Sequence, residues 1–467
     1  DWSSDVCSSD LWGSSAGSTS KSGNGVSWTS QSYELNFKSY LAPNNPFLGG
    51  IRYYKTDGTK ITLIANKTGV YRVNDATGAL TQIFAGTTTA TYYRFEKVDD
   101  KACFVNGKDV PQFYDGSTVS AVPGSPPVAK DVKLHKNRLH FLSASDSRDI
   151  FSEAGDFSTY LSVNFFYIPS PRSADEVLKM SVMQDNLIFR TRETKWVLYG
   201  SDLSSFTLRR STALAGLTNA EGLAGQDNYE YSVVDNGIYQ FNGATDILIS
   251  EPIQPDFDAI ANKEEMSAVI SGNLLRVFYP LAGETQNTHA FVYDLKFKIW
   301  FIDDNAYFAG AFVMKGGDDE ETLVLGSSMV GAVYYADTGY SDLGAPITDR
   351  YWTPYESYGT PEQLKIMRRF FPKFIGAQAA YTCDIYVDFD YRNTPALVSS
   401  VVLLSDGPLW GYFTWGQALW GRVGNIEPEL EVEGEFRSRQ YRFEHTGVDQ
   451  PVELYGMTDY FFPQRSL

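Results

Sequence analysis

Short apolar segments alternate with polar turns along most of this chain, and one two-strand unit recurs seven times. Each copy has an apolar strand, a polar turn and a second strand with an aromatic or β-branched residue at its centre, as in 62–73 (TLIANKTGVYRV) and 186–200 (NLIFRTRETKWVLYG). The equivalent central residues are Tyr71, Phe113, Phe151, Val197, Tyr239, Val292 and Tyr334. They lie 38 to 53 residues apart, a spacing typical of the four-stranded blades of a β-propeller.

Further apolar runs flank these pairs and complete the predicted blades. A strand is expected before the pair at 51–56, 92–98, 132–136, 177–183, 266–271 and 308–315, and after it at 80–85, 206–212, 247–253 and 299–303. Turn residues every 8–12 positions predict an all-β fold, and no convincing amphipathic helix is present. Seven repeats favour seven blades. Six is the alternative, because the 53-residue step carries insertions at 262–266 and 282–288.

The repeat stops after Pro346, where the character of the chain changes. We therefore assign 33–345 to the propeller and 346–467 to a C-terminal β-sandwich-like domain. Strands are expected in that domain at 381–391, 397–404, 430–433, 437–444 and 451–461. The preceding segment 12–32 is rich in Ser, Gly and Thr and is predicted to be flexible.

The first eleven residues, DWSSDVCSSDL, resemble the translation of a short-read sequencing adapter. We interpret 1–11 as a sequencing artefact and leave it out of the reasoning about the fold. The alternative is a genuine polar tail. If 1–11 is an artefact, we expect the natural N-terminus to be missing and the first blade to be incomplete.

The composition excludes several classes of protein. The formal net charge is −18, or −15 without 1–11, which argues against a general DNA-binding surface, since such a surface needs clustered Lys and Arg. The three cysteines, Cys7, Cys103 and Cys383, are too dispersed for a disulfide framework or a Cys-rich metal site. No apolar run approaches the roughly 18 residues needed to span a bilayer.

No pattern of catalytic or metal-binding residues stands out. His135, His140, His289 and His445 show no metal-ligand spacing, and the chain lacks a GxSxG elbow, a P-loop and a dinucleotide fingerprint. We read the acidic run 318–321 as a hairpin turn rather than a calcium site, because the spacing of oxygen ligands in an EF-hand is absent. No catalytic, cofactor-binding or metal residues are therefore assigned, and the chain is predicted not to be an enzyme.

A Trp-Gly repeat in 408–421 (PLWGYFTWGQALWG) is the one candidate contact loop. Trp410, Trp415 and Trp420 recur at steps of five residues. In one interpretation the three indoles form an exposed stacking platform for sugar or for a partner protein. In the other, which we favour, the rings pin a long loop onto its own domain, with Gly permitting the turns.

The order of several phrases resembles a known family. These phrases are HKNRLHFL (135–142), DIFSEAGDFSTY (149–160), NLIFRTRETKWVLYGS (186–201), STALAGLTNAEGLAGQDNYEYSVVDNGIYQFNG (211–243), ISEPIQPDFDAI (249–260), FVYDLKFKIWFI (291–302) and WGRVGNIEPELEVEGEFRSRQYRFE (420–444). Together they resemble the packaged-DNA stabilisation proteins, the tail-hub or nozzle proteins of short-tailed bacteriophages. The resemblance covers about 50–460.

The resemblance implies a structural virion protein of the phage tail, assembled in the bacterial cytoplasm. It implies a propeller that joins its own copies in a ring, expected to be a hexamer, below the portal and its adaptor. Such a ring would extend the channel for double-stranded DNA, help to retain packaged DNA and bind fibre, spike or needle proteins, with no cofactor. An acidic lumen would let the duplex pass without adhering.

Two other functions fit parts of the sequence. A carbohydrate-binding or carbohydrate-active propeller is the first alternative, in which Trp410, Trp415 and Trp420 would hold sugar. A cellular protein-interaction propeller is the second, but the chain lacks the repeated Trp-Asp blade ending of that class.

Overall fold

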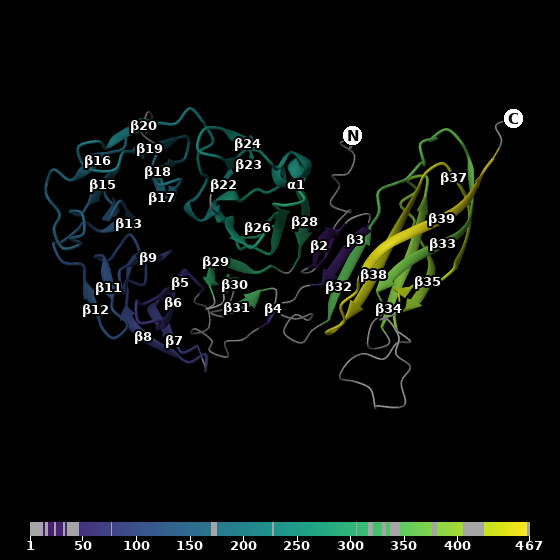
Figure 1. Cartoon of the computed structure of the whole chain (residues 1–467), viewed down its shortest axis with the longest axis horizontal. Coiled ribbons are helices and arrows are strands. Elements are labelled where there is room, and N and C mark those ends of the chain that lie inside the picture. The colour runs from purple at the N-terminus through teal and green to yellow at the C-terminus, as the bar shows by residue number, and fades with distance from the viewer. Residues whose placement is uncertain are drawn as a thin grey trace. The chain divides into compact units, whose positions relative to one another are not determined.

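The computed structural model (Figure 1) describes residues 46–464 apart from 76, 170–174, 227, 305, 316–320, 329–332, 337–345, 376–380 and 405–424. Nearer the N-terminus it gives the backbone of β1 (Gly13–Ser14), β2 (Gly17–Ser22), β3 (Gly25–Ser30) and β4 (Tyr33–Glu34), of which β2 and β3 pair antiparallel. The chain divides into two compact units. The larger comprises Leu35–Trp300 and Asn305–Ala336, and the smaller comprises Asp1–Glu34, Phe301–Asp304 and Asp337–Leu467.

Seven sheets follow one another from β5 to β31, with their strands hydrogen-bonded in chain order. Blade one has β5 (Gly49–Tyr54), β6 (Lys60–Asn66), β7 (Gly69–Val73) and β8 (Leu80–Ala85), and blade two has β9 (Arg94–Val98), β10 (Lys101–Val105), β11 (Gln112–Tyr114) and β12 (Val119–Ala121). Blade three has β13 (Ala129–His135), β14 (Arg138–Ser143), β15 (Arg148–Phe151) and β16 (Phe165–Tyr167), and blade four has β17 (Val177–Met183), β18 (Asn186–Thr191), β19 (Lys195–Tyr199) and β20 (Thr207–Arg210).

The remaining blades follow the same order. Blade five has β21 (Leu223–Gln226), β22 (Tyr229–Val234), β23 (Gly237–Phe241) and β24 (Asp246–Leu248), and blade six has β25 (Ser267–Ser271), β26 (Leu274–Tyr279), β27 (His289–Asp294) and β28 (Ile299–Asp303). Blade seven contributes β29 (Phe308–Lys315), β30 (Glu321–Ser327) and β31 (Val333–Ala336). The predicted all-β propeller is confirmed, and seven sheets are present rather than six.

The apolar core of the propeller lies between neighbouring blades. Each strand alternates its side chains between the two faces of its sheet, so the apolar residues of one blade meet those of the next. Ile61 and Leu63 of blade one share a cluster with Phe104 of blade two, and Leu142 of blade three shares one with Phe189 of blade four. A blade cannot bury its faces alone, so each depends on its neighbours.

The ring closes between the seventh and first blades through Phe47. This residue is almost fully buried and packs with Ile64 of β6 and Val324 of β30. Its backbone N–H donates to the carbonyl of Ser327 (3.2 Å). A Cβ at Gly326 would lie 2.0 Å from the Phe47 ring, so the aromatic residue fits because position 326 is glycine. The first and last blades are therefore joined by a side chain that precedes the first repeat.

One predicted strand is wrong in part. The run 247–253 is not a continuous strand: β24 ends at Leu248, and a 3-10 turn, η2 (Glu251–Ile253), leads into the short helix α1 (Gln254–Asp258). Pro252 and Pro255 have no N–H for a strand ladder but fit the first turn of a helix. Two further 3-10 turns are η1 (Ala220–Gly222) and η3 (Lys263–Glu265).

The smaller unit contains a two-layer β-sandwich. One sheet has the order β32 (Ile347–Trp352), β38 (Arg439–Gly447), β34 (Thr382–Phe389) and β35 (Ala396–Val402). In the other, β33 (Lys365–Ile375) pairs with β39 (Leu454–Pro463), β37 (Leu430–Phe436) and β36 (Asn425–Ile426). The layers bury one apolar cluster that includes Phe370, Cys383 and Phe443. Cys103 and Cys383 are both buried free thiols.

Replacing Phe47 by Ala should destabilise the protein by about 3–5 kcal/mol, because it removes a buried aromatic ring at the closure and leaves a cavity. Chemical denaturation followed by tryptophan fluorescence would measure the change. Phe462→Ala is the matched control: Phe462 is 65% exposed, so the free energy of unfolding should change by less than about 0.5 kcal/mol. Equal losses in the two variants would contradict the closure assigned to Phe47.

Candidate functional site: the charged centre and an interblade groove

The first strands of neighbouring blades lie next to one another around the propeller axis. β9 lies between β5 and β13, β13 lies next to β17, and β29 lies next to both β25 and β5. Two of these strands carry charged residues at alternate positions, Arg94 and Glu96 in β9 and Asp131 and Lys133 in β13. Residues two apart on a strand share a face, so the charges gather on one side of β9 and on one side of β13.

Arg94 joins four blades at this centre. From blade two its guanidinium donates to the carbonyls of Lys130 in blade three (3.1 Å) and Leu178 in blade four (3.0 Å). It also pairs with Glu221 of η1, at the start of blade five (3.3 Å), and lies 3.8 Å from Asp131. Only 9% of the Arg94 side chain is exposed. The charge of Arg94 is thus compensated by groups of three other blades.

Other groups complete this network. The Asp131 carboxylate, 1% exposed, accepts a hydrogen bond from the backbone N–H of Met180 in blade four (2.7 Å). The Lys133 ammonium pairs with Glu96 of blade two (2.9 Å). Burial lowers the pKa of Lys179, despite the opposing effect of Glu221. Because buried charges are tolerated only when they are paired and hydrogen-bonded, this centre holds its blades in one arrangement.

A second buried network joins blades four and five away from the axis. Arg190 of β18 pairs with Glu230 of β22, and Lys195 of β19 pairs with Asp246 of β24. Both cations also face the ring of Phe241, at 5.2 Å and 4.3 Å from its centroid. Burial, aided by the neighbouring Arg190, lowers the pKa of Lys195 to about 8. Four charged side chains therefore connect two blades within an apolar environment.

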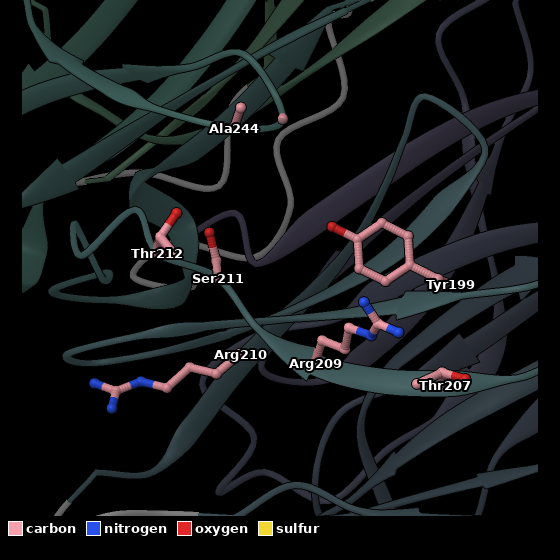
Figure 2. Close-up of a pocket in the computed structure, with 8 residues that line it drawn as sticks. Tyr199, Thr207, Arg209, Arg210, Ser211, Thr212 and Ala244 are labelled. Atoms are coloured by element: carbon pink, nitrogen blue, oxygen red, sulfur yellow. The ribbon is translucent and has the colours of Figure 1, made fainter.

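A groove opens beside this second network (Figure 2). Its cavity of about 490 Å³ is lined by Tyr199, Thr207, Arg209, Arg210, Ser211, Thr212, Gly243 and Ala244. One wall is the outer edge of blade four, and the other is the turn between β23 and β24 of blade five. In Figure 2 the Arg209 side chain is directed to the same side as Tyr199, whereas Arg210 extends to the opposite side. The lining therefore combines two cations, four hydroxyl groups and no carboxylate.

Comparison with known proteins adds a likeness of fold. No protein-family model and no curated protein sequence matches the chain. Similar solved structures include BBS1N in complex with ARL6DN (12% identity, 67% of this chain and 99% of that chain, TM-score 0.45) and BamB from Moraxella catarrhalis (11% identity, 69% and 96%, TM-score 0.41). YCF48 bound to D1 peptide is similar at 9% identity over 66% and 98% of the two chains, with a TM-score of 0.41.

All four histidines lie in strands of the described structure. His135 and His140 come together in blade three, with ring centroids 5.7 Å apart. The Nδ1 of His140 contacts the Asp149 carboxylate at 2.7 Å, and both side chains are fully buried. His289 lies in β27 and His445 in β38. Within the described part of the chain, no three His, Cys, Asp or Glu side chains are grouped so that they could hold a metal ion.

The predicted contact loop is not tested by the structure. Trp410, Trp415 and Trp420 lie outside the described residues. Of the acidic run 318–321, only Glu321 lies within the described residues, where it is the register partner of Lys315 in the pairing of β29 with β30. None of the helices in the described segments is long and apolar enough to cross a membrane.

Sequence reasoning did not find the charged centre or the groove. The alternation of charges in β9 (RFEKV) was the available signal for the centre, because a half-buried strand with charges on one face needs partners there. The groove left no such signal. Its residues come from the end of blade four and from a turn of blade five, which only the tertiary structure brings together.

Replacing Arg190 by Met should cost about 3–5 kcal/mol, because Glu230, 3% exposed, keeps a buried charge without its partner. The double variant Arg190→Met/Glu230→Leu should recover most of that loss, since no lone charge remains. Chemical denaturation of the four proteins of the cycle would give the coupling energy. As a control, Arg369→Met breaks the half-exposed Arg369–Glu429 pair and should cost less than about 1 kcal/mol. Additive losses from Arg190 and Glu230 would contradict the proposed coupling.

Proposed function

We propose that this chain is a structural virion protein, a tail-hub or nozzle subunit that acts by assembling into a ring. The ring extends the DNA channel below the portal and its adaptor and helps to retain packaged DNA. The ordered phrases that resemble the nozzle proteins of short-tailed phages provide the reason for this family. Its partners are further copies of the chain, the portal adaptor and the fibre, spike or needle proteins.

The observation that carries the proposal furthest is the charged centre. Arg94 from blade two satisfies its charge on groups of blades three, four and five, so the middle of the propeller is used to fix blades to one another. A body held in this way suits a subunit that transmits force between neighbours. Its outer loops and edges are then the surfaces that remain for partners.

Two of the phrases that carry the resemblance include residues of the contacts between blades four and five. The phrase 186–201 includes β18 and β19, which supply Arg190 and Lys195, and the phrase 211–243 includes β22, which supplies Glu230. The resemblance thus falls on the hairpins that hold blades four and five together. This is the pattern expected if the family shares a rigid propeller body.

The proposed DNA channel lies between subunits rather than through one propeller, because Arg94 links the inner strands of the propeller to one another. The net charge of −15 that remains without 1–11 suits such a channel. Duplex DNA binds to surfaces that neutralise its phosphates with Lys and Arg, and an acidic lumen repels it. Heterologous contacts between identical subunits close into rings when the rotation between neighbours permits.

Purified full-length protein should form sixfold rings, alone or when mixed with the portal-adaptor protein encoded in the same locus. Mass photometry would give the copy number, and negative-stain electron microscopy would show the ring. The adaptor by itself is the control, because its own oligomer must be distinguished from rings that contain this chain. Persistent monomers with and without the adaptor, at micromolar concentrations and low salt, would contradict the proposed function.

A further inference from the structure

The groove between blades four and five carries positive charge that nothing in the described structure neutralises. Arg209 and Arg210 are both exposed, and neither forms an ion pair or hydrogen bond with a side chain in the described segments. Other arginines of this region are paired, Arg190 with Glu230 and Arg192 with Glu264 (3.5 Å). Successive residues of a strand point to opposite faces of the sheet, so Arg209 shares the face of Tyr199 and Thr207 in the β19–β20 pair and Arg210 does not. In a chain of net charge −18, Arg209 is therefore the unpaired cation on this wall of the groove.

Hydroxyl groups extend this donor surface. Thr207 donates to the carbonyl of Ser205 (3.3 Å), and Ser211 accepts from the N–H of Ala213 (3.1 Å). The hydroxyls of Tyr199 and Thr212 make no hydrogen bond within the described part of the protein, and Figure 2 shows the Tyr199 hydroxyl directed toward Ser211. Two hydroxyl donors therefore remain available to a bound group.

The opposite wall is fixed in place. Gly243 has φ +97°, a conformation that favours glycine. Asn242, which precedes Gly243, accepts a hydrogen bond at its carbonyl from the Gln184 side chain of blade four (3.2 Å). The same side chain also donates to the carbonyl of Asn228 (3.4 Å). The buried pairs Arg190–Glu230 and Lys195–Asp246 hold the same two blades. The groove is thus formed before any ligand arrives, which reduces the entropic cost of binding.

We propose that this groove binds a carboxylate of an acidic peptide segment. Arg209 pairs with the carboxylate, and the Tyr199 hydroxyl supplies a further donor while its ring packs against the chain of the peptide. An arginine guanidinium matches the planar geometry of a carboxylate. A volume of about 490 Å³ suits a few peptide residues and is too small for duplex DNA. The partner is an acidic loop of another protein, whose charge complements that of this groove.

Isothermal titration with an acetylated, amidated hexaglutamate peptide tests this inference directly. The wild type should bind it, and the affinity should fall about tenfold or more in Arg209→Gln/Arg210→Gln, because the charge-assisted hydrogen bonds are lost. Arg437→Gln is the matched control: Arg437 is an exposed arginine of the sandwich, and its loss changes the net charge without touching the groove. That variant should bind within about twofold of the wild type. Thermal melting of each variant would verify that it is folded.

Three results would overturn the inference. In the first, the wild type does not bind hexaglutamate. In the second, the Arg209→Gln/Arg210→Gln variant binds it with unchanged affinity. In the third, the wild type binds hexaglutamine as tightly as hexaglutamate. Inorganic phosphate serves as a separate arm of the experiment. Tighter binding of phosphate than of the peptide would assign the groove to free phosphate and overturn the carboxylate assignment. The inference does not depend on the proposed function, because ring formation does not enter this assay.

Discussion

The ionic contacts between blades are the constraint on which the rest of the propeller depends. The charge of Arg94, whose side chain is 9% exposed, is tolerated because carbonyls and carboxylates of three other blades surround it. If a blade moved outward, the guanidinium would lose a partner at a site that is little exposed to solvent. The apolar clusters between blades supply most of the stabilisation, but they are not directional. The ion pairs define which arrangement of the blades is allowed.

Much of the propeller could be predicted from the sequence, and the reason is periodicity. Hairpins such as β6–β7 and β18–β19 combine buried alternation with polar turns, so their strands were found almost to the residue. The first strand of blade five was missed, because β21 (LAGQ) consists of small residues without an apolar alternation. The longest sandwich strand, β33, was missed because it contains Arg368, Arg369 and Pro372. Pro372 lies between the segments that pair with β37 and with β36, a position at which a strand tolerates proline.

The functional surfaces were harder to predict, because they join residues far apart in the chain. Phe47 precedes the first repeat, yet it completes the contact between blades seven and one. The groove joins the end of one blade to a turn of the next. Both depend on which sheets become neighbours, and no local pattern encodes that. If the chain assembles as a tail hub, as we propose, its function depends on such surfaces.

The central claim is that Arg94 couples the blades around the axis, and native-state hydrogen exchange of Arg94→Met tests it most directly. Amides of β9, β13 and β17 in the wild type should share one opening free energy, as expected for a cooperative unit. In the variant, protection should fall in all three strands, because Asp131 and the carbonyls of Lys130 and Leu178 lose their common partner. As a control, Arg437→Met replaces an exposed arginine and should leave the protection of these three strands unchanged. Loss of protection in β9 alone, with β13 and β17 as slow to exchange as in the wild type, would contradict the account.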